Sequence, residues 1–267
     1  MKGRVFIIAG SDSGGGAGIQ ADIKTVTALG GYAMTAITAL TAQNTLGVQA
    51  IHDVPADFVA AQMRAVLPDI GADCVKIGML HRADVIDAVC AVLGELVPGV
   101  PLVVDPVMVA KGGHSLLAQD AEQALRAGMI PLASLLTPNI PEAEALIGAK
   151  IKNRADAEAA AHGLAALGAK AVLLKGGHME GDVVTDILVE EGGRLTAFES
   201  PRIDSDQTHG TGCTLASAIA TGLAQGLPLN AAVARARDYV LEAIRSAPGL
   251  GRGHGPLNHS HTVKPFP

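Results

Sequence analysis

The segment best suited to chemistry is a short glycine-rich stretch near the C-terminus, Gln207-Thr-His-Gly-Thr-Gly-Cys-Thr214. It leads into an apolar, alanine-rich sequence that predicts a helix. Unpaired backbone N–H groups at a helix start attract anions, and glycines let the backbone close around a phosphate without Cβ clashes. The stretch is not a P-loop, because no Gly-Lys-Ser/Thr follows. An anion site and a plain glycine-rich helix start both fit the pattern.

Cys213, at the start of that helix, has two interpretations. It can be a small buried hydrophobic residue, which is the common state of a free cysteine. It can also be a thiol whose pKa is lowered by the helix N-terminus. Cys74 and Cys90 fit the first interpretation. The three cysteines are widely separated and show no metal-ligand spacing, so neither a metal site nor a disulfide framework is expected.

Polar residues also follow several predicted strands. Asp105 and Lys175 each end a short apolar run, and Asn139 and Glu142 form an Asn-x-x-Glu after another. Ligands of an open parallel sheet bind beyond the carboxyl ends of its strands, so we expect these residues to meet. The carboxylates suit Mg²⁺, directly or through water, and the lysine suits a phosphate. The plainer alternative for Asn139 and Glu142 is a helix N-cap with an acidic first turn. The plainer alternative for Lys175 is a charged side chain at the point where the chain leaves the sheet.

A second glycine-rich loop, Gly14-Gly-Gly-Ala-Gly18, follows the first predicted strand. The dinucleotide template Gly-x-Gly-x-x-Gly, started at Gly14, is met at Gly16 but fails at Ile19, where a very small residue is needed. No acidic residue ends the next strand, where a ribose contact is expected. Both features argue against a nicotinamide-dependent oxidoreductase.

Strands and helices alternate around these residues, which predicts a mostly parallel sheet covered on both faces. A hairpin is expected over residues 183–199, a polar loop over 41–45 and an irregular tail from Pro248. No linker or repeat divides the chain, so a single domain over residues 1–267 is predicted. Strands are expected over residues 4–9, 32–40, 48–54 (an edge strand), 74–77, 102–105, 135–137 and 171–175, and helices over 19–29, 56–67, 83–96, 119–129, 155–167, 213–225 and 229–246.

Composition limits the classes of partner. The chain has 267 residues, 49% of them apolar, which suffices for one large α/β domain. The net charge of −6 argues against nucleic acid. The apolar stretch after Arg4 is too short for a signal peptide, and no stretch reaches the roughly 18 apolar residues of a membrane span. We therefore expect a soluble cytoplasmic protein without membrane partners. Aromatic residues are 2%, so a planar ligand would be held by aliphatic side chains, methionine and backbone.

Taken together, the motifs resemble those of bacterial hydroxymethylpyrimidine/phosphomethylpyrimidine kinases, over essentially the whole chain. Each motif alone is weak, and the combination is specific. The segments that carry the resemblance are Ala9-Gly-Ser-Asp-Ser-Gly-Gly-Gly-Ala-Gly-Ile-Gln-Ala-Asp-Ile-Lys-Thr25, Ile37-Thr-Ala-Leu-Thr-Ala-Gln-Asn-Thr45, Lys76-Ile-Gly-Met79, Asp105-Pro-Val-Met-Val-Ala-Lys-Gly-Gly113, Thr137-Pro-Asn139, Lys175-Gly-Gly-His178, Thr208-His-Gly-Thr-Gly-Cys-Thr214 and Gly253-His-Gly-Pro-Leu-Asn-His259.

The resemblance implies a ribokinase-like fold of three α/β/α layers, with a central, mainly parallel sheet and a small β flap over the substrate. It implies ATP and Mg²⁺ as cofactors, and a homodimer. It also implies two successive reactions of thiamine biosynthesis. The first phosphorylates the hydroxyl of 4-amino-5-hydroxymethyl-2-methylpyrimidine, and the second converts the monophosphate to the diphosphate.

Carried over to this sequence, the resemblance makes Gly210, Thr211, Gly212 and Cys213 the anion hole for the transferring phosphoryl group. Cys213 stands where most ribokinase-like sugar kinases have an aspartate base, so it would take the proton from the substrate hydroxyl. The nucleotide residues implied by the resemblance are Asp105 and Glu142, which would organise Mg²⁺ and its waters, and Asn139, Lys175 and Thr208, which would contact the phosphates.

The resemblance makes Gln43 the residue that reads the pyrimidine. Its carboxamide has a donor and an acceptor side by side, which complement the amino group and neighbouring ring nitrogen of an aminopyrimidine. Without the resemblance, the favoured interpretation of Gln43 is a solvent-facing loop residue. The other substrate-binding residues implied by the resemblance are Gly10, Asp22, Met79, Val107 and His209.

One position departs from the family pattern, since Gln207 replaces the usual asparagine before Thr-His-Gly. This leaves nucleotide affinity or choice open. A pyridoxal kinase of the same lineage is the nearest alternative, although a pyridoxal ring lacks the aminopyrimidine edge that suits Gln43. A non-catalytic pyrimidine sensor on the same fold is a second alternative. Replacement of Cys213, Asp105 or the glycine-rich turn would favour the sensor, and all are present.

Overall fold

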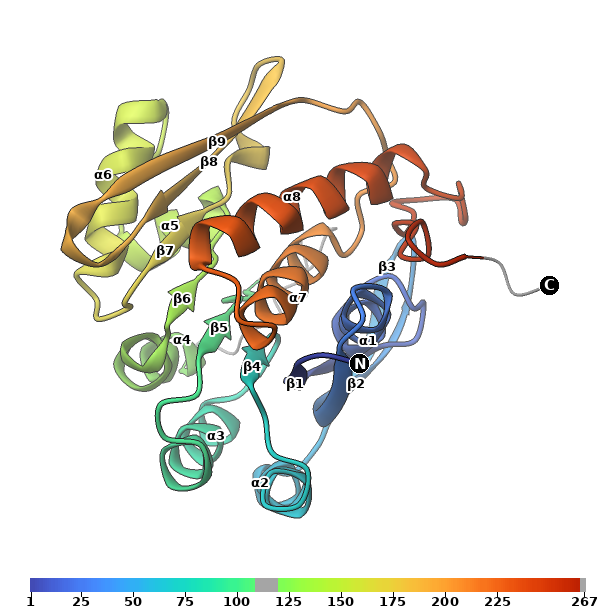
Figure 1. Ribbon diagram of the computed structural model, residues 1–267, viewed down its shortest axis with the longest axis vertical. Helices are drawn as coiled ribbons and strands as arrows, with labels where there is room; N and C mark the ends of the chain where they lie inside the picture. Colours follow the sequence, from blue (N-terminus) through green and yellow to red (C-terminus); the bar gives the residue numbers. More distant parts are fainter. Residues whose placement is uncertain (109–119, 265–267) are drawn as a thin grey trace.

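The computed structural model describes residues 1–108 and 120–264, and a nine-stranded sheet forms the middle layer of that part (Figure 1). The strand order is β3-β2-β1-β4-β5-β6-β7-β8-β9. Neighbours from β2 to β7 pair in parallel, whereas β3 at one edge and β8 and β9 at the other pair antiparallel. This confirms the predicted mainly parallel sheet. The strands are β1 (Arg4–Asp12), β2 (Tyr32–Asn44), β3 (Gly47–Asp53), β4 (Cys74–Ile77), β5 (Leu102–Val104), β6 (Leu135–Leu136), β7 (Val172–Leu174), β8 (Val183–Val189) and β9 (Leu195–Pro201).

Helices cover both faces of the sheet (Figure 1). In β1, Phe6 and Ile8 pack in the core beneath α2, α3, α5 and α6, whereas Val5 and Ile7 pack beneath α1, α7 and α8. All four side chains are fully buried. Burial on both faces explains why the central strands are continuous apolar runs. The helices are α1 (Gly18–Ala28), α2 (Ala56–Val66), α3 (Ala83–Leu96), α4 (Ala121–Ala124), α5 (Ile140–Ile147), α6 (Arg154–Ala165), α7 (Thr211–Ala224) and α8 (Leu229–Arg245).

The antiparallel hairpin of β2 and β3 forms the expected flap. The predicted polar loop over residues 41–45 is wrong, because β2 continues through Asn44 and pairs with β3 (Gln43 with Val48, and Asn44 with Gly47). A bulge between Ala42 and Gln43 shifts the register there. Polar residues are tolerated in this strand because many of its side chains, unlike those of β1, are exposed or half-buried.

Two helical regions also differ from prediction. The helix expected over 119–129 is the single turn α4, followed by a π-helical turn over Leu125–Met129 and a 3-10 turn over Ile130–Leu132, while Gln119 lies outside the described residues. Pro131 lacks the N–H needed to continue an α-helix. Helix α5 is absent from the predicted ranges and was anticipated only as the alternative of an N-cap at Asn139; Pro141 lies in its first turn, where a proline disrupts no intrahelical hydrogen bond.

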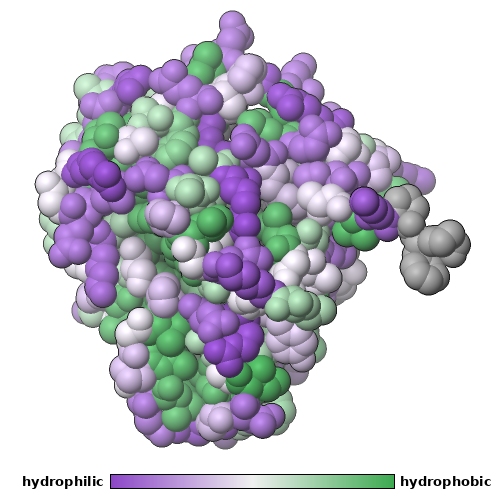
Figure 2. Space-filling view, viewed as in Figure 1, coloured by the Kyte–Doolittle hydropathy of each residue, from purple (hydrophilic) through white to green (hydrophobic). Residues whose placement is uncertain are grey.

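Two observations concern a possible membrane span and the hydropathy of the surface. Within residues 1–108 and 120–264, no helix is both long and apolar enough to cross a membrane. Figure 2 shows hydrophilic and hydrophobic residues interspersed over the face that carries α7 and α8.

Candidate active site

The carboxyl ends of β5 and β7 and the start of α5 bring three predicted residues together. Nζ of Lys175 lies 2.7 Å from Oδ1 of Asp105 and 4.0 Å from Oε2 of Glu142. Both carboxyl groups are buried. Burial alone would lower the pKa of Lys175, but the two carboxylates raise it above its ordinary value. Lys175 is therefore a charged ammonium group between two acids, and the predicted meeting of strand-end residues is confirmed.

Asn139 and Glu142 also cap α5. The Asn139 side chain accepts a hydrogen bond from the backbone N–H of Glu142 at 2.9 Å, and Oε2 of Glu142 accepts one from the N–H of Asn139 at 2.7 Å. The two bonds form a capping box, which bears out the plainer interpretation of a helix N-cap with an acidic first turn. Burial raises the pKa of Glu142 to about 7, with Lys175 opposing and Asp105 adding to that shift. Glu142 thus both caps α5, through its bond with the N–H of Asn139, and lies beside the ammonium group of Lys175.

The glycine-rich turn before α7 faces this cluster. Gly210 is the N-cap of α7 with a left-handed φ of 81°, and the Thr211 hydroxyl donates to the carbonyl oxygen of Thr208 at 2.7 Å. In the part of the chain that the structure describes, no side chain caps α7, whose N-cap is a glycine, in contrast to α5, which Asn139 caps. A Cβ on Gly212 would lie 3.2 Å from Nζ of Lys175 and 3.5 Å from Oδ2 of Asp105. Uncapped backbone N–H groups therefore lie beside the lysine, which is an arrangement suited to an anion.

Cys213 follows this turn in the first turn of α7. Burial raises the pKa of its thiol to about 11, Lys76 opposes that shift, Asp22 and Asp105 add to it, and the N–H of Gly18 opposes it. The direction is opposite to the lowered pKa that its position at a helix start suggested. The effects of burial and of two nearby carboxylates outweigh those of the helix terminus and Lys76.

A buried ion pair lies close to Cys213. Lys76 and Asp22 have no exposed side-chain surface, and Nζ of Lys76 lies 2.9 Å from Oδ2 of Asp22. Ser217 on α7 donates to Oδ1 of Asp22 at 2.6 Å. Burial alone would lower the pKa of Lys76, but Asp22 raises it. Asp22 therefore departs from the prediction that it lines the pyrimidine pocket, because both its oxygens bond to protein groups and neither faces open space.

Three of the residues predicted for the pyrimidine pocket meet on the flap side. Met79 is buried against Ala39, with Ile51 and Val107 packed beside them. A Cβ on Gly10 would overlap the terminal methyl group of Met79, so the Met79 side chain packs directly on the backbone at Gly10. The result is an aliphatic and methionine surface of the kind that the scarcity of aromatic residues suggested.

Gln43 of the flap and His209 before α7 lie close to each other. Nε2 of Gln43 lies 3.4 Å from Nε2 of His209, and the same imidazole nitrogen lies 2.9 Å from Oδ2 of Asp12. The shorter contact assigns the imidazole proton to the bond with Asp12, so this nitrogen cannot also accept from Gln43. With respect to residues 1–108 and 120–264, the Gln43 amide N–H groups are therefore available to a ligand, and the Gln43 oxygen accepts from the Thr41 hydroxyl at 3.0 Å.

Asp12 is a functional candidate that sequence reasoning missed. Its Oδ1 accepts from the N–H of Gly14 at 2.8 Å, and its Oδ2 accepts from those of Gly16 at 3.0 Å and Ala17 at 2.8 Å. The first glycine-rich loop therefore folds around a carboxylate of its own chain and does not offer these donors to a nucleotide. An aspartate shortly before a glycine run is the signal that could have revealed this turn.

Asp12→Asn is expected to lower the free energy of unfolding by about 2 kcal/mol at neutral pH, since a hydrogen bond to a charged group contributes about 1.5–3 kcal/mol. Burial would raise the pKa of Asp12, but His209 and the N–H groups of Ala17 and Gly14 together lower it below 3.8. The contribution is therefore complete above that value and is lost as the pH falls through and below it. Urea unfolding of both proteins at about pH 7 and about pH 3 measures the change. The exposed Asp87→Asn on α3 is the matched control. A destabilisation of equal size at both pH values would contradict this account.

The donors fit Mg²⁺ in part. No group of three or more His, Cys, Asp or Glu side chains converges in residues 1–108 and 120–264. Asp105 and Glu142 provide two buried carboxyl groups beside Lys175. Mg²⁺ is usually held by one or two carboxylates, several waters and substrate phosphates, so these residues are compatible with it.

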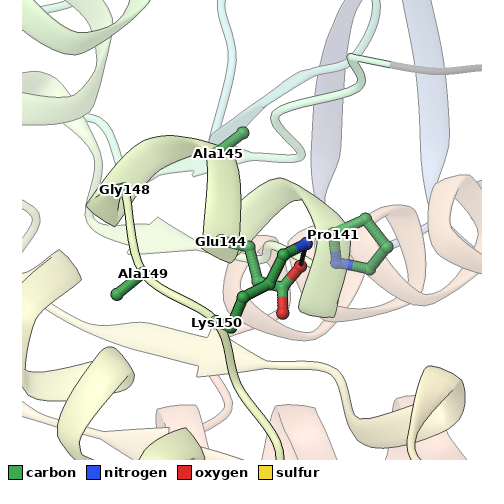
Figure 3. Close-up of a pocket in the computed structure, with 6 residues that line it drawn as sticks. All are labelled: Pro141, Glu144, Ala145, Gly148, Ala149 and Lys150. Carbon is green, nitrogen blue, oxygen red and sulfur yellow. Dashed lines mark hydrogen bonds and ion pairs between the residues drawn. The ribbon is translucent and has the colours of Figure 1, made fainter.

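A surface hollow of about 350 Å³ lies on α5 and the segment after it (Figure 3). It is lined by Pro141, Glu144, Ala145, Gly148, Ala149 and Lys150, and Lys150 pairs with Glu144 at 2.7 Å across its floor. None of the predicted site residues lines it. Residues 109–113, the second part of the Asp105–Gly113 segment, lie outside the described residues.

Comparisons with a family model and with curated relatives point to the same family of kinases. A family model described as phosphomethylpyrimidine kinase matches residues 12–258. The thiamine biosynthesis bifunctional protein ThiED of Geobacter sulfurreducens is 57% identical over 258 residues, which are 97% of this chain but 52% of that protein, so the chain spans about half of its length. The hydroxymethylpyrimidine/phosphomethylpyrimidine kinase of Haemophilus influenzae is 47% identical, with 96% of each chain covered. A solved ADP complex of Bacillus subtilis pyridoxal kinase is 35% identical, with a TM-score of 0.88 over 97% of this chain and 98% of that one.

Proposed function

The chain belongs to the hydroxymethylpyrimidine/phosphomethylpyrimidine kinase family, and we propose how its site carries out two successive phosphoryl transfers from ATP. The first acceptor is the hydroxymethyl group of 4-amino-5-hydroxymethyl-2-methylpyrimidine, and the second is the monophosphate that this step produces. The observation that supports the site assignment is the position of the α7 N-terminus. Gly212 lies beside Lys175 and Asp105, while His209, next to Gly210, meets Gln43.

Nucleotide binding is assigned to the side of the turn that carries Lys175. Lys175, Asn139 and Thr208 contact the ATP phosphates in this proposal. Asp105 and Glu142 hold Mg²⁺, partly through water, and the bound ion neutralises charge on the phosphates. Lys175 must then exchange part of its bond with Asp105 for a phosphate oxygen, which keeps its charge paired throughout.

Pyrimidine binding is assigned to the flap side. Gln43 bonds to the amino group and adjacent ring nitrogen, while Met79, Val107 and the backbone at Gly10 contact the ring faces and edges. His209 lies between Gln43 and the α7 turn, next to the acceptor group. In this proposal Asp22 does not contact the pyrimidine itself and acts only through its ion pair with Lys76.

Phosphoryl transfer takes place at the Gly210–Cys213 turn. Its backbone N–H groups stabilise the charge of the transferring group. Cys213 accepts the proton of the acceptor hydroxyl. Because burial raises the pKa of the thiol to about 11, the form of Cys213 that accepts this proton is the thiolate, which is the minor form at neutral pH. A loose transition state, in which positioning and charge stabilisation dominate, places the proton transfer late in the reaction.

The test of this function is ADP release with ATP and Mg²⁺, offering hydroxymethylpyrimidine, its monophosphate and pyridoxal in parallel. Turnover of the first two with slow turnover of pyridoxal is the expected result. The similarity to a pyridoxal kinase of known structure makes pyridoxal the informative competitor. Preference for pyridoxal would overturn the role of Gln43, and no turnover of any acceptor would favour a sensor.

Gln43→Met is expected to weaken hydroxymethylpyrimidine binding by about 10–100-fold, because the pyrimidine edge loses partners for its polar groups while the pocket keeps its volume. Calorimetric titration with the pyrimidine measures the change. Gln49→Met, an exposed glutamine on β3 of the same flap, is the matched control. Unchanged affinity in Gln43→Met would refute the recognition role.

A homodimer and a cytoplasmic location complete the proposal. The homodimer comes from the family resemblance, and the cytoplasmic location is the expectation drawn from the sequence patterns. Sedimentation velocity tests the first, and cell fractionation tests the second.

A further inference from the structure

The segment that follows α8 returns to the active site and touches it at several points. We call Arg252–His259 the C-terminal strap. Sequence patterns predicted only an irregular tail here. Figure 1 shows the dark red chain beyond α8 next to the hairpin of β2 and β3.

The first contact of the strap is with the tip of the flap. The backbone N–H groups of Arg252 and Gly253 both approach Oγ1 of Thr45, at 3.2 and 3.3 Å. A Cβ on Gly253 would overlap the Thr45 carbonyl oxygen. Glycine is thus needed for the strap to lie against the flap, and Thr45 is two residues from Gln43.

The second contact is with the segment that precedes α7. The N–H of His209 donates to the carbonyl oxygen of Gly255 at 3.1 Å, and the N–H of Gly255 donates to that of Asp206 at 3.2 Å. Pro256 lies beside His209 in a single parallel bridge. A Cβ on Gly255 would overlap the Gln207 side chain, so the two segments are in close contact.

The third contact anchors the strap on α7 and α8. Nε2 of His259 lies 3.0 Å from the hydroxyl of Thr214, and Tyr239 donates to the carbonyl oxygen of His259 at 2.8 Å. Burial lowers the pKa of His259 to about 4, with Lys24 adding to that shift, so the imidazole is neutral. Leu257 is buried as well. The far end of the strap is therefore fixed to the core.

These contacts join two parts of the site that have different tasks. Thr45 belongs to the flap that carries Gln43, and His209 adjoins the Gly210–Cys213 turn. We propose that the C-terminal strap is a positioning element that holds the flap over the acceptor, so that it governs binding of the pyrimidine and not of the nucleotide. This inference rests on the proposed function, because it takes the flap side as the acceptor side.

The test removes the two hydrogen bonds between the strap and Thr45 while nearly keeping the shape of the side chain. Thr45→Val loses the Oγ1 acceptor and is expected to raise the KM for hydroxymethylpyrimidine about tenfold, as the loss of a hydrogen-bonded contact does. The KM for ATP should not change. Thr45→Ser keeps the oxygen and should restore the KM. Thr262→Val removes the bond of the same tail to the carbonyl of Ala28 (2.9 Å), far from the flap, and is the matched control.

A second measurement does not depend on activity. Hydrogen–deuterium exchange should become faster in peptides covering residues 40–53 and 252–255 of Thr45→Val, and not of Thr45→Ser. Unchanged exchange, or equal rises in both KM values, would overturn the proposal. If the unmodified chain fails to phosphorylate the pyrimidine, the proposed function fails, and the exchange experiment alone still decides whether the strap holds the flap.

Discussion

Cys213→Ala is expected to reduce turnover of hydroxymethylpyrimidine by about 10²–10⁴-fold, the usual contribution of a general base. Turnover of the monophosphate should fall by less than about tenfold, because the second acceptor needs no base. A phosphate monoester has its second pKa near 6, so its attacking oxygen is already ionised at neutral pH. The two reactions use the same nucleotide, the same glycine-rich turn and the same ring pocket. They differ in whether the attacking oxygen of the acceptor must first lose a proton.

The measurement is kcat for both acceptors under saturating ATP and Mg²⁺, in the unmodified chain and in Cys213→Ala. Alanine keeps the backbone N–H of residue 213, so the anion hole is retained. The thiolate fraction grows tenfold per pH unit below a pKa of about 11. Turnover of the alcohol by the unmodified chain should therefore rise with pH in a way that turnover of the monophosphate does not.

The matched control is Cys90→Ala, a half-buried cysteine on α3 whose pKa burial also raises to about 11. It should leave both reactions unchanged. Equal losses with both acceptors in Cys213→Ala would show that the thiol acts through packing. Full activity with the alcohol would remove the base assignment.

Gly210→Ala is expected to reduce kcat/KM for both acceptors at least about 100-fold, the effect of losing one donor of an anion hole. Gly210 has a φ of 81°. A Cβ there would overlap the carbonyl oxygen of Gly16 in the first glycine-rich loop. The turn must move away from that loop, which displaces the N–H groups that face Lys175.

The control for Gly210→Ala lies at the other end of the same helix. Gly226 has a φ of 85°, and a Cβ on it would meet nothing within 4 Å. Gly226→Ala carries the same backbone strain, about 1–2 kcal/mol, without the overlap. Thermal unfolding of the two variants and their kcat/KM values separate strain from displacement. Similar kinetic losses in both would show that the turn is sensitive to helix stability and not to its fit against Gly16.

Regular elements with strong periodicity were predictable to the residue. The predicted bounds of β4 (Cys74–Ile77) and α3 (Ala83–Leu96) match the structure, since apolar runs and helical spacing depend on local sequence. The meeting of Asp105, Glu142 and Lys175 was also predictable, because parallel strands end at the same edge of a sheet.

The rest depended on partners that are distant in the sequence. Asp12 meets His209, and Lys76 meets Asp22 on another element, so neither pair has a local pattern. Of the two interpretations of Cys213, the one with a lowered pKa is wrong, because the helix start is a local feature whereas the burial and the carboxylates that raise the pKa are not. The strap has no periodicity at all, and its glycines are explained only by the segments that they touch.

The carboxylate of Asp12 has a consequence for how the molecule separates its two glycine-rich loops. A loop of this kind becomes a receptor for phosphate when its N–H groups are vacant, and here a resident anion already occupies them. The first loop therefore has these N–H groups bonded within its own chain, and Gly210 and His209 pack against it. This arrangement gives selectivity between the two loops. The negative charge of Asp12 repels a polyphosphate from the first loop, whereas the N-terminus of α7, whose N-cap is a glycine, offers its backbone N–H groups.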